Sequence, residues 1–581
     1  MKLRYIFAAF VAAIPLCNNM AQNNTRTMKL HIIETSDVHG SFFPYNFIER
    51  REANGSLARV SSYVESLRKE SDGNVILLDN GDILQGQPTC YYYNYVQTAK
   101  PNIAARIYNY MHYDAATFGN HDIEPGHSVY DKWVNETNCP VLGANIIDRQ
   151  TGLPYVKPYT IIERGGLRVA VLGMLTPAIP SWLEEKLWSG LYFENIVPAA
   201  KKWVAYLKKN EKPDLIVALF HSGWDGGIVT DQYTEDAAKD AAQQVDGLDI
   251  IFFGHDHRAR KAVEKSPDGT NVLCLDPSNN ALNVAHAEVT ITKEGDKVVE
   301  KKIDGQIKDI TKEPVDEKYV DFFADDINEV KKYIGKKIGN IAKTMYTRDS
   351  FFGSSTFIDL IHNLQLKLTK ADISFNAPLQ FNAEIKQGPI FMSDMFKLYR
   401  YENKLCVLKM TGEEIRKHLE MSYDLWVNTM SSKDDHIMLL DKRNNTDMQK
   451  FGFKNMTFNF DSAAGIDYEV DVTKPDGKKV RILRMSDGKP FDPQKWYLVA
   501  MNSYRANGGG ELLTKGAGIP KQELRSRVVY ESDLDLRHYL AQEIEKQGKI
   551  TPRSNNNWRF VPQSWTKSAI ERDRKLLFGN K

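Results

Sequence analysis

Five short stretches of the chain place side chains that bind metals or move protons directly after apolar runs. The central one is Gly119-Asn120-His121-Asp122, which follows the run 115–118 and is expected to leave a buried strand. Asn120 offers a neutral oxygen ligand, His121 a general acid, and Asp122 a carboxylate that could orient the His121 imidazole. Taken alone, the tetrapeptide could equally be an Asx-type turn with a surface histidine.

Four other stretches repeat this design. They are Asp37-Val38-His39-Gly40 after 30–36, Asp79-Asn80-Gly81-Asp82 after 75–78, His221 after 214–220, and Gly254-His255-Asp256-His257 after 250–253. Amphipathic helical patterns lie between the runs, at 57–69 and 199–209. Alternating strands and helices favour an α/β fold, in which ligands bind beyond the carboxyl ends of the strands. We therefore expect the five polar ends to meet in one crevice, provided that the strands run parallel or turn back to it.

Seven oxygen and nitrogen ligands would meet in that crevice, without a cysteine among them. They are Asp37, His39, Asp82, Asn120, His221, His255 and His257. Seven ligands are too many for one tetrahedral zinc ion. They suit two divalent ions, such as Mn²⁺, Zn²⁺ or Co²⁺, that share a carboxylate. The sequence therefore predicts a site with two divalent ions.

Two such ions would suit phosphate-ester hydrolysis. They would neutralise charge on the transferring group and lower the pKa of a bound water towards ~7, so that hydroxide attacks in line without a covalent intermediate. His121, held by Asp122, is predicted to stabilise or protonate the departing oxygen. Asn145 ends another strand-like run at 142–145 and is predicted to touch the substrate.

The metal motifs resemble those of a known family. Asp37-x-His39, Gly81-Asp82, Gly119-Asn120-His121-Asp122, His221 and Gly254-His255-x-His257 are similar to the motifs of the calcineurin-like metallophosphoesterases. The stretch 77–82 with Gln85-Gly86 narrows the resemblance to the secreted 5′-nucleotidase and cyclic-nucleotide phosphodiesterase group. The resemblance implies that Asp37, His39, Asp82 and His257 hold one ion, while Asp82, Asn120, His221 and His255 hold the other. It also implies a four-layer αββα catalytic domain joined by a helical linker to an α+β domain.

The second half of the chain resembles the 5′-nucleotidase C-terminal domain, which implies recognition of a nucleoside. Tyr504, in the stretch 502–510, matches the aromatic that stacks on the base. Phe460 matches the facing aromatic because Gly465 to Tyr468 follow it at the spacing of the family. Base–aromatic stacking contributes about 1–3 kcal/mol per base and tolerates different bases. The alternative is that both rings are core residues.

One departure from the family concerns the ester that is cleaved. Many 5′-nucleotidases carry an Asn-Gly-Gly-Gly-Ile-Arg-like stretch, where this chain has residues 374–382, Ser-Phe-Asn-Ala-Pro-Leu-Gln-Phe-Asn. Together with the stretch 399–405, this resembles the bacterial 2′,3′-cyclic phosphodiesterase/3′-nucleotidase branch. We therefore expect hydrolysis of 2′,3′-cyclic nucleotides and 3′-nucleotides. The alternatives are a 5′-nucleotidase or UDP-sugar hydrolase, and a degenerate binding protein without turnover, which the presence of all seven ligands disfavours.

Length and charge fit an enzyme for small substrates. The chain has 581 residues, enough for two domains, with 76 basic and 75 acidic side chains. This balance argues against a nucleic-acid polymer as partner, because such a surface needs a basic excess. The expected organisation is a catalytic domain at 28–313, a helical linker at 314–347 and a nucleotide-recognition domain at 348–565.

The N-terminus is expected to be a signal peptide at 1–21. A basic start precedes the short apolar run 5–16, and Ala21 supplies a small residue at the cleavage point. No later stretch is long enough to span a membrane, so an exported protein, periplasmic or secreted, is predicted. Lipidation at Cys17 is the alternative, although Leu16 stands where a small residue would be expected.

Four further cysteines lie far apart in the sequence and lack the close pairs of a zinc site. They are Cys90, Cys139, Cys274 and Cys406. These cysteines could form one or two disulfides or be buried free thiols, and the sequence does not distinguish the two states.

Overall fold

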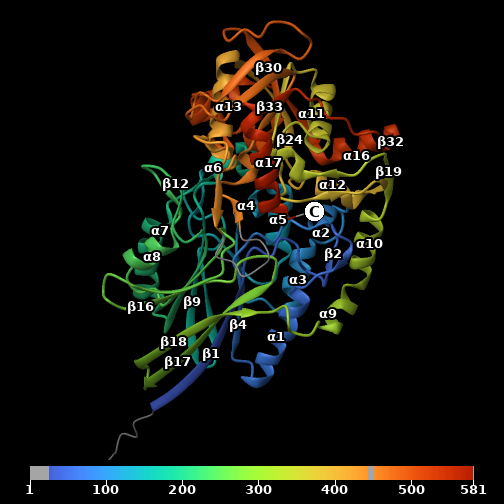
Figure 1. Cartoon of the computed structure of the whole chain (residues 1–581). Coiled ribbons are helices and arrows are strands. Elements are labelled where there is room, and N and C mark those ends of the chain that lie inside the picture. Colours follow the sequence, from blue (N-terminus) through green and yellow to red (C-terminus); the bar gives the residue numbers. More distant parts are fainter. Residues whose placement is uncertain (1–24, 443–450, 580–581) are drawn as a thin grey trace, which may run out of the picture.

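A computed structural model of the chain describes residues 25–442 and 451–579 (Figure 1). The expected signal peptide and Cys17 lie outside these residues. Among the helices of the described ranges, none is long and apolar enough to cross a membrane. The four cysteines within these ranges are free thiols, and three of them are buried.

The first domain contains a six-stranded sheet in the order β18-β17-β1-β4-β5-β6. Its strands are β1 (Thr25–Thr35), β4 (Val75–Asp79), β5 (Ala115–Thr117), β6 (Val141–Leu142), β17 (Asn283–Glu294) and β18 (Lys297–Asp309). The strands β1, β4, β5 and β6 run parallel. The strands β17 and β18 form a long hairpin, and β17 pairs antiparallel with β1. The parallel half of this sheet leads to three of the predicted ligand stretches.

A second six-stranded sheet has the order β15-β16-β14-β11-β9-β8. Its strands are β8 (Tyr159–Arg164), β9 (Leu167–Leu175), β11 (Leu215–His221), β14 (Ile250–Phe253), β15 (Arg260–Lys265) and β16 (Asn271–Asp276). The four central strands β9, β11, β14 and β16 are parallel. The remaining two ligand stretches leave β11 and β14.

The two sheets pack face to face between two layers of helices. In β1, Ile32 faces the other sheet while Ile33 faces the helices, since neighbouring residues of a strand point to opposite sides. The helices on the first sheet include α1 (Leu57–Glu70), α3 (Ile103–Met111) and α5 (His127–Glu136), and those on the second are α7 (Ile196–Tyr206) and α8 (Ala238–Gln244). In α1, Leu57, Val60 and Val64 form the buried stripe. The predicted four-layer αββα fold is confirmed.

The predicted helical linker is shorter in the structure. Two helices, α9 (Glu317–Phe322) and α10 (Ala324–Ile334), follow the first domain and pack into its core through residues such as Tyr319 and Val330. The chain then forms β19 (Lys337–Ile341), which pairs with two strands of the second domain, β23 (Gly388–Phe391) and β32 (Lys549–Ile550). The prediction of a helical linker as far as 347 is therefore wrong, because residues 337–341 and 345–346 are strands of the second domain.

The second domain is built on a five-stranded sheet in the order β27-β21-β30-β24-β31. Its strands are β21 (Ile373–Asn376), β24 (Lys404–Thr411), β27 (Ser462–Ala464), β30 (Trp496–Asn502) and β31 (Val528–Asp535). A smaller sheet contains β28 (Ile466–Asp471), β29 (Val480–Met485) and β33 (Trp558–Val561).

Helices cover the sheet of the second domain, and the last of them marks the C-terminal end of the domain. They include α11 (Thr356–Thr369), α12 (Met392–Leu398), α13 (Gly412–Trp426), α16 (Leu536–Gln547) and α17 (Gln563–Phe578). Helix α13 begins with a capping box between Thr411 and Glu414. Ala569 and Leu577 of α17 are buried in the domain core. The domain therefore extends beyond the predicted boundary at 565.

Candidate active site

All seven predicted ligands lie at one edge of the first domain. Asp37 and His39 follow β1, Asp82 follows β4, and Asn120 opens the short helix α4 (Asn120–Ile123) after β5. From the second sheet, His221 ends β11, and His255 and His257 follow β14. Because these strands are parallel, their carboxyl ends lie at the same edge, as expected.

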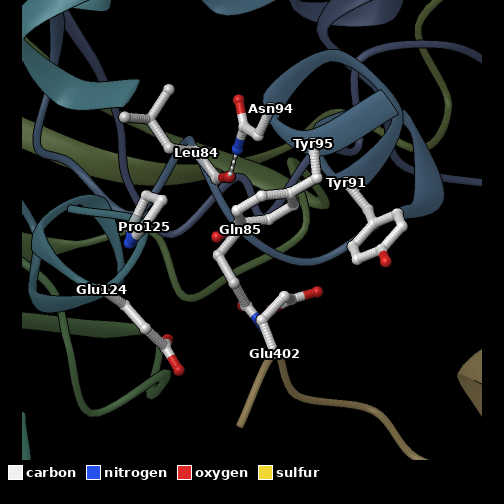
Figure 2. Close-up of a pocket in the computed structure, with 8 residues that line it drawn as sticks. All are labelled: Leu84, Gln85, Tyr91, Asn94, Tyr95, Glu124, Pro125 and Glu402. Carbon is white, nitrogen blue, oxygen red and sulfur yellow. Dashed lines mark hydrogen bonds between the residues drawn. The ribbon is translucent and has the colours of Figure 1, made fainter. Parts of the chain in front are cut away.

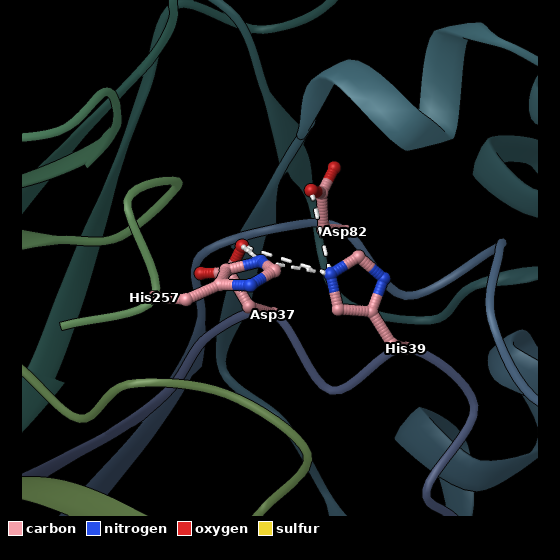
Figure 3. A group of neighbouring side chains, drawn as sticks. All are labelled: Asp37, His39, Asp82 and His257. Carbon is pink, nitrogen blue, oxygen red and sulfur yellow. Dashed lines mark hydrogen bonds and ion pairs between the residues drawn. The ribbon is translucent and has the colours of Figure 1, made fainter. Parts of the chain in front are cut away.

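Four of these side chains form one compact group (Figure 3). Ligand atoms of Asp37, His39, Asp82 and His257 all lie within 4.8 Å of one another. The Nε2 atoms of His39 and His257 are 3.1 Å apart, and Asp37 Oδ1 lies 3.2 Å from His257 Nε2. Asp37 Oδ1 is buried and has no hydrogen-bond partner. A divalent ion fits this group, because it would satisfy the unpaired oxygen and both ring nitrogens.

A second group shares Asp82 with the first. His221 Nε2 lies 3.4 Å from Asp82 Oδ2 and 3.2 Å from Asn120 Oδ1. His255 Nδ1 lies 2.8 Å from Asn120 Oδ1. Asp82 therefore stands between the two groups, where a carboxylate could bridge two ions.

Outer hydrogen bonds orient the imidazoles. The pairs are His39 Nδ1 with Gln85 O at 3.1 Å, His221 Nδ1 with Asn80 O at 2.6 Å, and His255 Nε2 with Glu235 Oε1 at 3.0 Å. Each pair occupies one ring nitrogen and leaves the other facing the group, which is the usual arrangement around a metal. Glu235 comes from β13 (Thr234–Asp236) and was not identified from the sequence. Glu235 lies 20 positions before His255, so no local sequence pattern connects the two residues.

The backbone around these ligands is strained. Five of the seven ligand residues have positive φ angles between 49° and 77°, namely Asp37, His39, Asp82, His255 and His257. Such angles cost non-glycine residues about 1–3 kcal/mol each and occur at functional sites where the surrounding structure imposes them. Gly119 is required for a different reason, because a Cβ atom there would lie 2.1 Å from Asp82 Oδ1. The chain packs this tightly to bring its ligands together.

The charge state of the group suits metal binding. Burial, with the neighbouring His257 ring, lowers the pKa of His39 to about 3 despite the nearby carboxylates. His39 is therefore neutral, which is the form that binds a metal. Burial opposes ionisation of Asp82, but the His221 and His121 imidazoles outweigh it and hold the pKa of Asp82 well below its ordinary value. Asp82 is therefore a carboxylate.

His121 is held by Glu124 rather than by Asp122. His121 Nδ1 lies 2.6 Å from Glu124 Oε2, one helical turn further along. Asp122 is fully buried and instead accepts hydrogen bonds from the backbone N–H groups of Gly119 and 82–84. The predicted orienting role of Asp122 is therefore wrong, because its carboxylate fixes the loop that carries Asp82.

The electrostatic surroundings favour a protonated His121. Burial favours the neutral ring, but the carboxylates of Asp82 and Glu124 outweigh it and raise the pKa of His121 to about 9. Cations held by Asp82 would oppose this rise, because they would neutralise its charge. His121 Nε2 is the ring nitrogen left for a substrate, since Nδ1 is paired with Glu124.

A cleft between the two domains joins this group to a set of aromatic rings. Its volume is about 700 Å³, and its lining includes Asp82, Asn120, His121, His255 and His257 from the first domain and Tyr401, Phe458 and Tyr504 from the second. The rings of Phe458 and Tyr504 meet edge to face, with centroids 6.0 Å apart. Tyr401 lies parallel to the His121 ring at 6.3 Å. A ligand in this cleft can reach both domains.

Two predicted substrate residues lie outside the cleft. Phe460 is fully buried and stacks on Trp426 at 5.3 Å in the core of the second domain. Asn145 is also fully buried, and its amide donates to the carbonyls of Leu175 and Glu194. Both predictions are therefore wrong. Phe458, two residues before Phe460, is the ring that faces the cleft with Tyr504.

The segment that departs from many 5′-nucleotidases reaches the same cleft. Leu379, from the stretch 374–382, contributes an apolar side chain to the lining. Arg400 lines the cleft beside Tyr401, and Arg258 comes from the opposite domain. The chain thus supplies cations to the cleft from positions that the sequence motifs did not indicate.

The domains also meet behind the cleft, around a small pocket (Figure 2). The side-chain amide of Gln85 donates to Glu402 of the second domain at 3.1 Å. The other oxygen of Glu402 accepts from Arg537 at 3.0 Å. The Arg537 guanidinium lies 3.9 Å from the centroid of Phe396 and 4.9 Å from that of Tyr91, which belongs to the first domain. These contacts connect the second domain to the loop that follows β4.

Comparisons with known proteins agree with this two-part architecture. Residues 30–259 match the calcineurin-like phosphoesterase family, and residues 337–515 match the 5′-nucleotidase C-terminal domain. A 2′,3′-cyclic-nucleotide 2′-phosphodiesterase/3′-nucleotidase from Yersinia enterocolitica is 27% identical over 94% of this chain and 90% of its own. A 5′-nucleotidase from Vibrio cholerae is 32% identical over 43% of this chain and 44% of its own.

The fold is shared with solved nucleotidase structures. A 5′-nucleotidase precursor from Thermus thermophilus aligns with a TM-score of 0.63 at 20% identity, over 92% of this chain and 99% of that one. Both domains are therefore present in their usual order, with the ligand-bearing strand ends of the first domain facing the second. The chain belongs to the calcineurin-like phosphoesterases that carry a 5′-nucleotidase C-terminal domain, and it is a hydrolytic enzyme of this metal-dependent family.

Proposed function

We propose that the chain hydrolyses the phosphate esters of 2′,3′-cyclic nucleotides and 3′-nucleotides. The observation that carries this proposal is the cleft in which the metal-ligand group and the aromatic rings face each other across two domains. A nucleotide has the matching polarity, with a phosphate at one end and a flat base at the other. The enzyme is proposed to work with two divalent ions of the Mn²⁺, Zn²⁺ or Co²⁺ class.

One ion is assigned to Asp37, His39, Asp82 and His257, and the other to Asp82, Asn120, His221 and His255. Bound there, the two ions would neutralise charge on the phosphate oxygens and provide hydroxide near neutral pH. The chain supplies one carboxylate placed to bridge and imidazoles whose outer nitrogens are already engaged. These donors are oxygen and nitrogen atoms only, which suits ions of this class.

His121 is proposed to serve the leaving oxygen. Its Nε2 atom faces the cleft and would carry the proton, while Glu124 holds Nδ1 and keeps the ring in one orientation. A proton placed in this way typically contributes about 10²–10⁴-fold to a rate. Tyr401 covers the ring from the side of the second domain and limits its contact with water.

Tyr504 and Phe458 are proposed to hold the base. Aromatic contacts of this kind are worth about 1–3 kcal/mol per base and tolerate different bases. The position of the phosphate on the ribose is then selected by the span between these rings and the metal ligands. Arg400 and Arg258, which line the cleft, are placed to attract an anionic substrate.

The choice of ester rests on two observations. Enzymes named 2′,3′-cyclic-nucleotide 2′-phosphodiesterase/3′-nucleotidase match more than nine-tenths of this chain at 27% identity. In addition, the segment 374–382 places Leu379 in the cleft, where many 5′-nucleotidases supply an arginine. Hydrolysis of 5′-nucleotides or UDP-sugars is the second candidate, favoured by the 32% identity of 43% of this chain to a 5′-nucleotidase.

A substrate panel tests this proposal. Purified enzyme with Mn²⁺ is assayed on 2′,3′-cyclic AMP, 3′-AMP, 5′-AMP, a UDP-sugar and p-nitrophenyl phosphate. The proposal expects kcat/KM to be highest for the cyclic and 3′ substrates. A higher value for 5′-AMP or the UDP-sugar would establish the second candidate instead, and no turnover of any ester would contradict both.

The place of action is proposed to be outside the cytoplasm. The basic start and apolar run of residues 1–21 support export. Expression of the full chain in a bacterial host, followed by separation of periplasm from cytoplasm and N-terminal sequencing, tests this. A mature N-terminus near Gln22 is expected, whereas an intact Met1 in the cytoplasm would contradict export.

A further inference from the structure

A second cluster of metal-binding side chains lies on the first domain, away from the catalytic group. Ligand atoms of His31, His286 and Glu288 lie within 4.8 Å of one another. His31 is on β1 and the other two are on β17, the neighbouring antiparallel strand. His31 precedes Asp37 by six residues of extended chain, so the two clusters are roughly 20 Å apart.

The strand register explains why these three side chains meet. His31 pairs directly with Glu288, and Ile33 pairs with His286. Residues directly opposite or two positions away on a neighbouring strand project from the same face of the sheet. The three side chains therefore share the face that α1 covers, and Tyr63 of α1 reaches His286 there. His31 and Glu288 remain accessible to solvent, while His286 is buried.

The contacts around His286 resemble those of a metal ligand. Its Nε2 atom faces His31 Nδ1 at 2.9 Å, and its Nδ1 atom lies 2.7 Å from the Tyr63 hydroxyl. A hydroxyl can donate or accept, so Tyr63 can satisfy His286 Nδ1 in either tautomer. When the Tyr63 oxygen accepts from Nδ1–H, Nε2 has no proton and is free to bind a cation. An outer partner of this kind commonly fixes a metal-binding histidine.

The charges around the cluster permit a cation. Lys308 is the opposing charge, and its ammonium lies 5.4 Å from the centre of the Tyr63 ring. Glu313 pairs with Lys308 at 2.9 Å and offsets that charge. Glu288 adds a carboxylate directly opposite His31.

We propose that His31, His286 and Glu288 form a separate site for a transition-metal ion such as Zn²⁺, Ni²⁺ or Cu²⁺. Two imidazoles and one carboxylate match the ligands that these ions prefer, and three protein ligands with water are a common zinc arrangement. Tyr63 is a positioning residue for His286. An ion there would join β1 to β17.

The test is zinc binding by the holoenzyme, with its catalytic ions already in place. Wild type and His31→Gln/Glu288→Gln are dialysed against graded Zn²⁺, and the metal content per chain is measured. The wild type is expected to hold one zinc more than the double variant, which should bind that ion at least about 100-fold more weakly, since even the loss of an outer partner costs 10–100-fold. Both replaced side chains reach solvent, so the fold should persist. Nucleotide hydrolysis should be unchanged.

Two further variants sharpen the result. His112→Gln replaces an exposed histidine outside the cluster and should match the wild type. Tyr63→Phe keeps all three ligands and should weaken the additional zinc about 10-fold while leaving hydrolysis intact. Equal zinc content in the wild type and the double variant would overturn the proposal. Wild type that holds no zinc beyond its catalytic ions would overturn it as well.

Discussion

His121 Nδ1 lies 2.6 Å from Glu124 Oε2, and both side chains belong to one turn of chain beyond the end of β5. The pairing leaves Nε2 of His121 as the ring nitrogen in the cleft. Glu124 thus does for His121 what carbonyl groups do for His39 and His221, where one ring nitrogen is fixed so that the other can act.

This pairing predicts separable effects at neighbouring positions. His121→Ala should keep both metal ions but lower kcat by about 10²–10⁴-fold, because proton transfer to the leaving oxygen is lost. Glu124→Gln should lower kcat less, since the ring remains but its orientation and charge are no longer supported. Asp122→Asn should mainly lower the melting temperature, because Asp122 accepts four backbone hydrogen bonds. Metal content, kcat and thermal unfolding are measured together. Loss of metal from His121→Ala would contradict these roles.

The aromatic residues should divide into substrate contacts and core. Tyr504→Ala and Phe458→Ala should raise KM for nucleotides far more than for p-nitrophenyl phosphate, which has no nucleoside. Phe460→Ala should instead destabilise the second domain by about 3–5 kcal/mol, because it leaves a cavity against Trp426. Steady-state kinetics on both substrates and denaturant unfolding separate the two outcomes. Equal losses on both substrates for the first pair would show that these rings do not hold the base.

Removal of divalent ions should abolish hydrolysis. Treatment with a chelator, followed by Mn²⁺, Zn²⁺ or Co²⁺, is expected to remove and then restore activity. Asp82→Asn should reduce the metal content of both groups, because the shared negative charge is lost, whereas His257→Gln should affect one ion. Elemental analysis of each variant gives the number of metal ions per chain. Full activity in protein shown to be free of metal would exclude the proposed mechanism.

Turnover should require the two domains to move. The two domains contact each other through ion pairs such as that between Lys186 of the first domain and Glu531 of the second. Joining K186C and E531C with a short thiol crosslinker should slow turnover while the metals remain bound, since release of product needs the cleft to open. The single variant K186C, treated in the same way, is the control. Unchanged kcat with a verified crosslink would show that this motion is not needed.

The free energy of unfolding should decrease as the pH is lowered, because of one buried histidine of the second domain. His362 is buried between Ser374 and Ser462, and burial lowers its pKa to about 3. The unfolded chain takes up a proton near pH 6.5 and the folded chain does not, so stability is lost as the pH falls from about 6.5 towards 3. The loss should be on the order of 1.4 kcal/mol for each pH unit. The free energy of unfolding of wild type and His362→Gln is measured from pH 7.5 to 4.5. An equal dependence on pH in the two proteins would contradict the role given to His362.

The meeting of the seven predicted ligand residues could be predicted because they follow strands. Each ligand comes directly after an apolar run, and a parallel sheet brings such ends to one edge regardless of their separation in the chain. The fold class followed from the same alternation of strands and helices. Asp37 and His257 are 220 positions apart and still meet at 3.2 Å, because each follows a strand of one of the two facing sheets.

The remaining site residues depended on packing that the local pattern does not contain. Phe458 and Phe460 are both apolar and two positions apart, and contacts with rings such as Trp426 and Phe453 bury Phe460 while Phe458 lines the cleft. Glu124 is three positions after His121, and residues three apart on a helix are neighbours, so the sequence alone does indicate this pair. Tyr401 and Glu235 reach the site from other parts of the chain, and their contacts come from the arrangement of loops rather than from a repeating pattern.

Gln85 belongs to two contacts at once. Its carbonyl fixes the ring of His39, and its side chain holds Glu402 of the other domain. A rotation that separates Glu402 from Gln85 therefore removes a restraint from the residue that orients a metal ligand. If an ion binds at His39 as proposed, its retention and closure of the domains around a nucleotide would be thermodynamically linked, and by reciprocity each would favour the other by the same free energy.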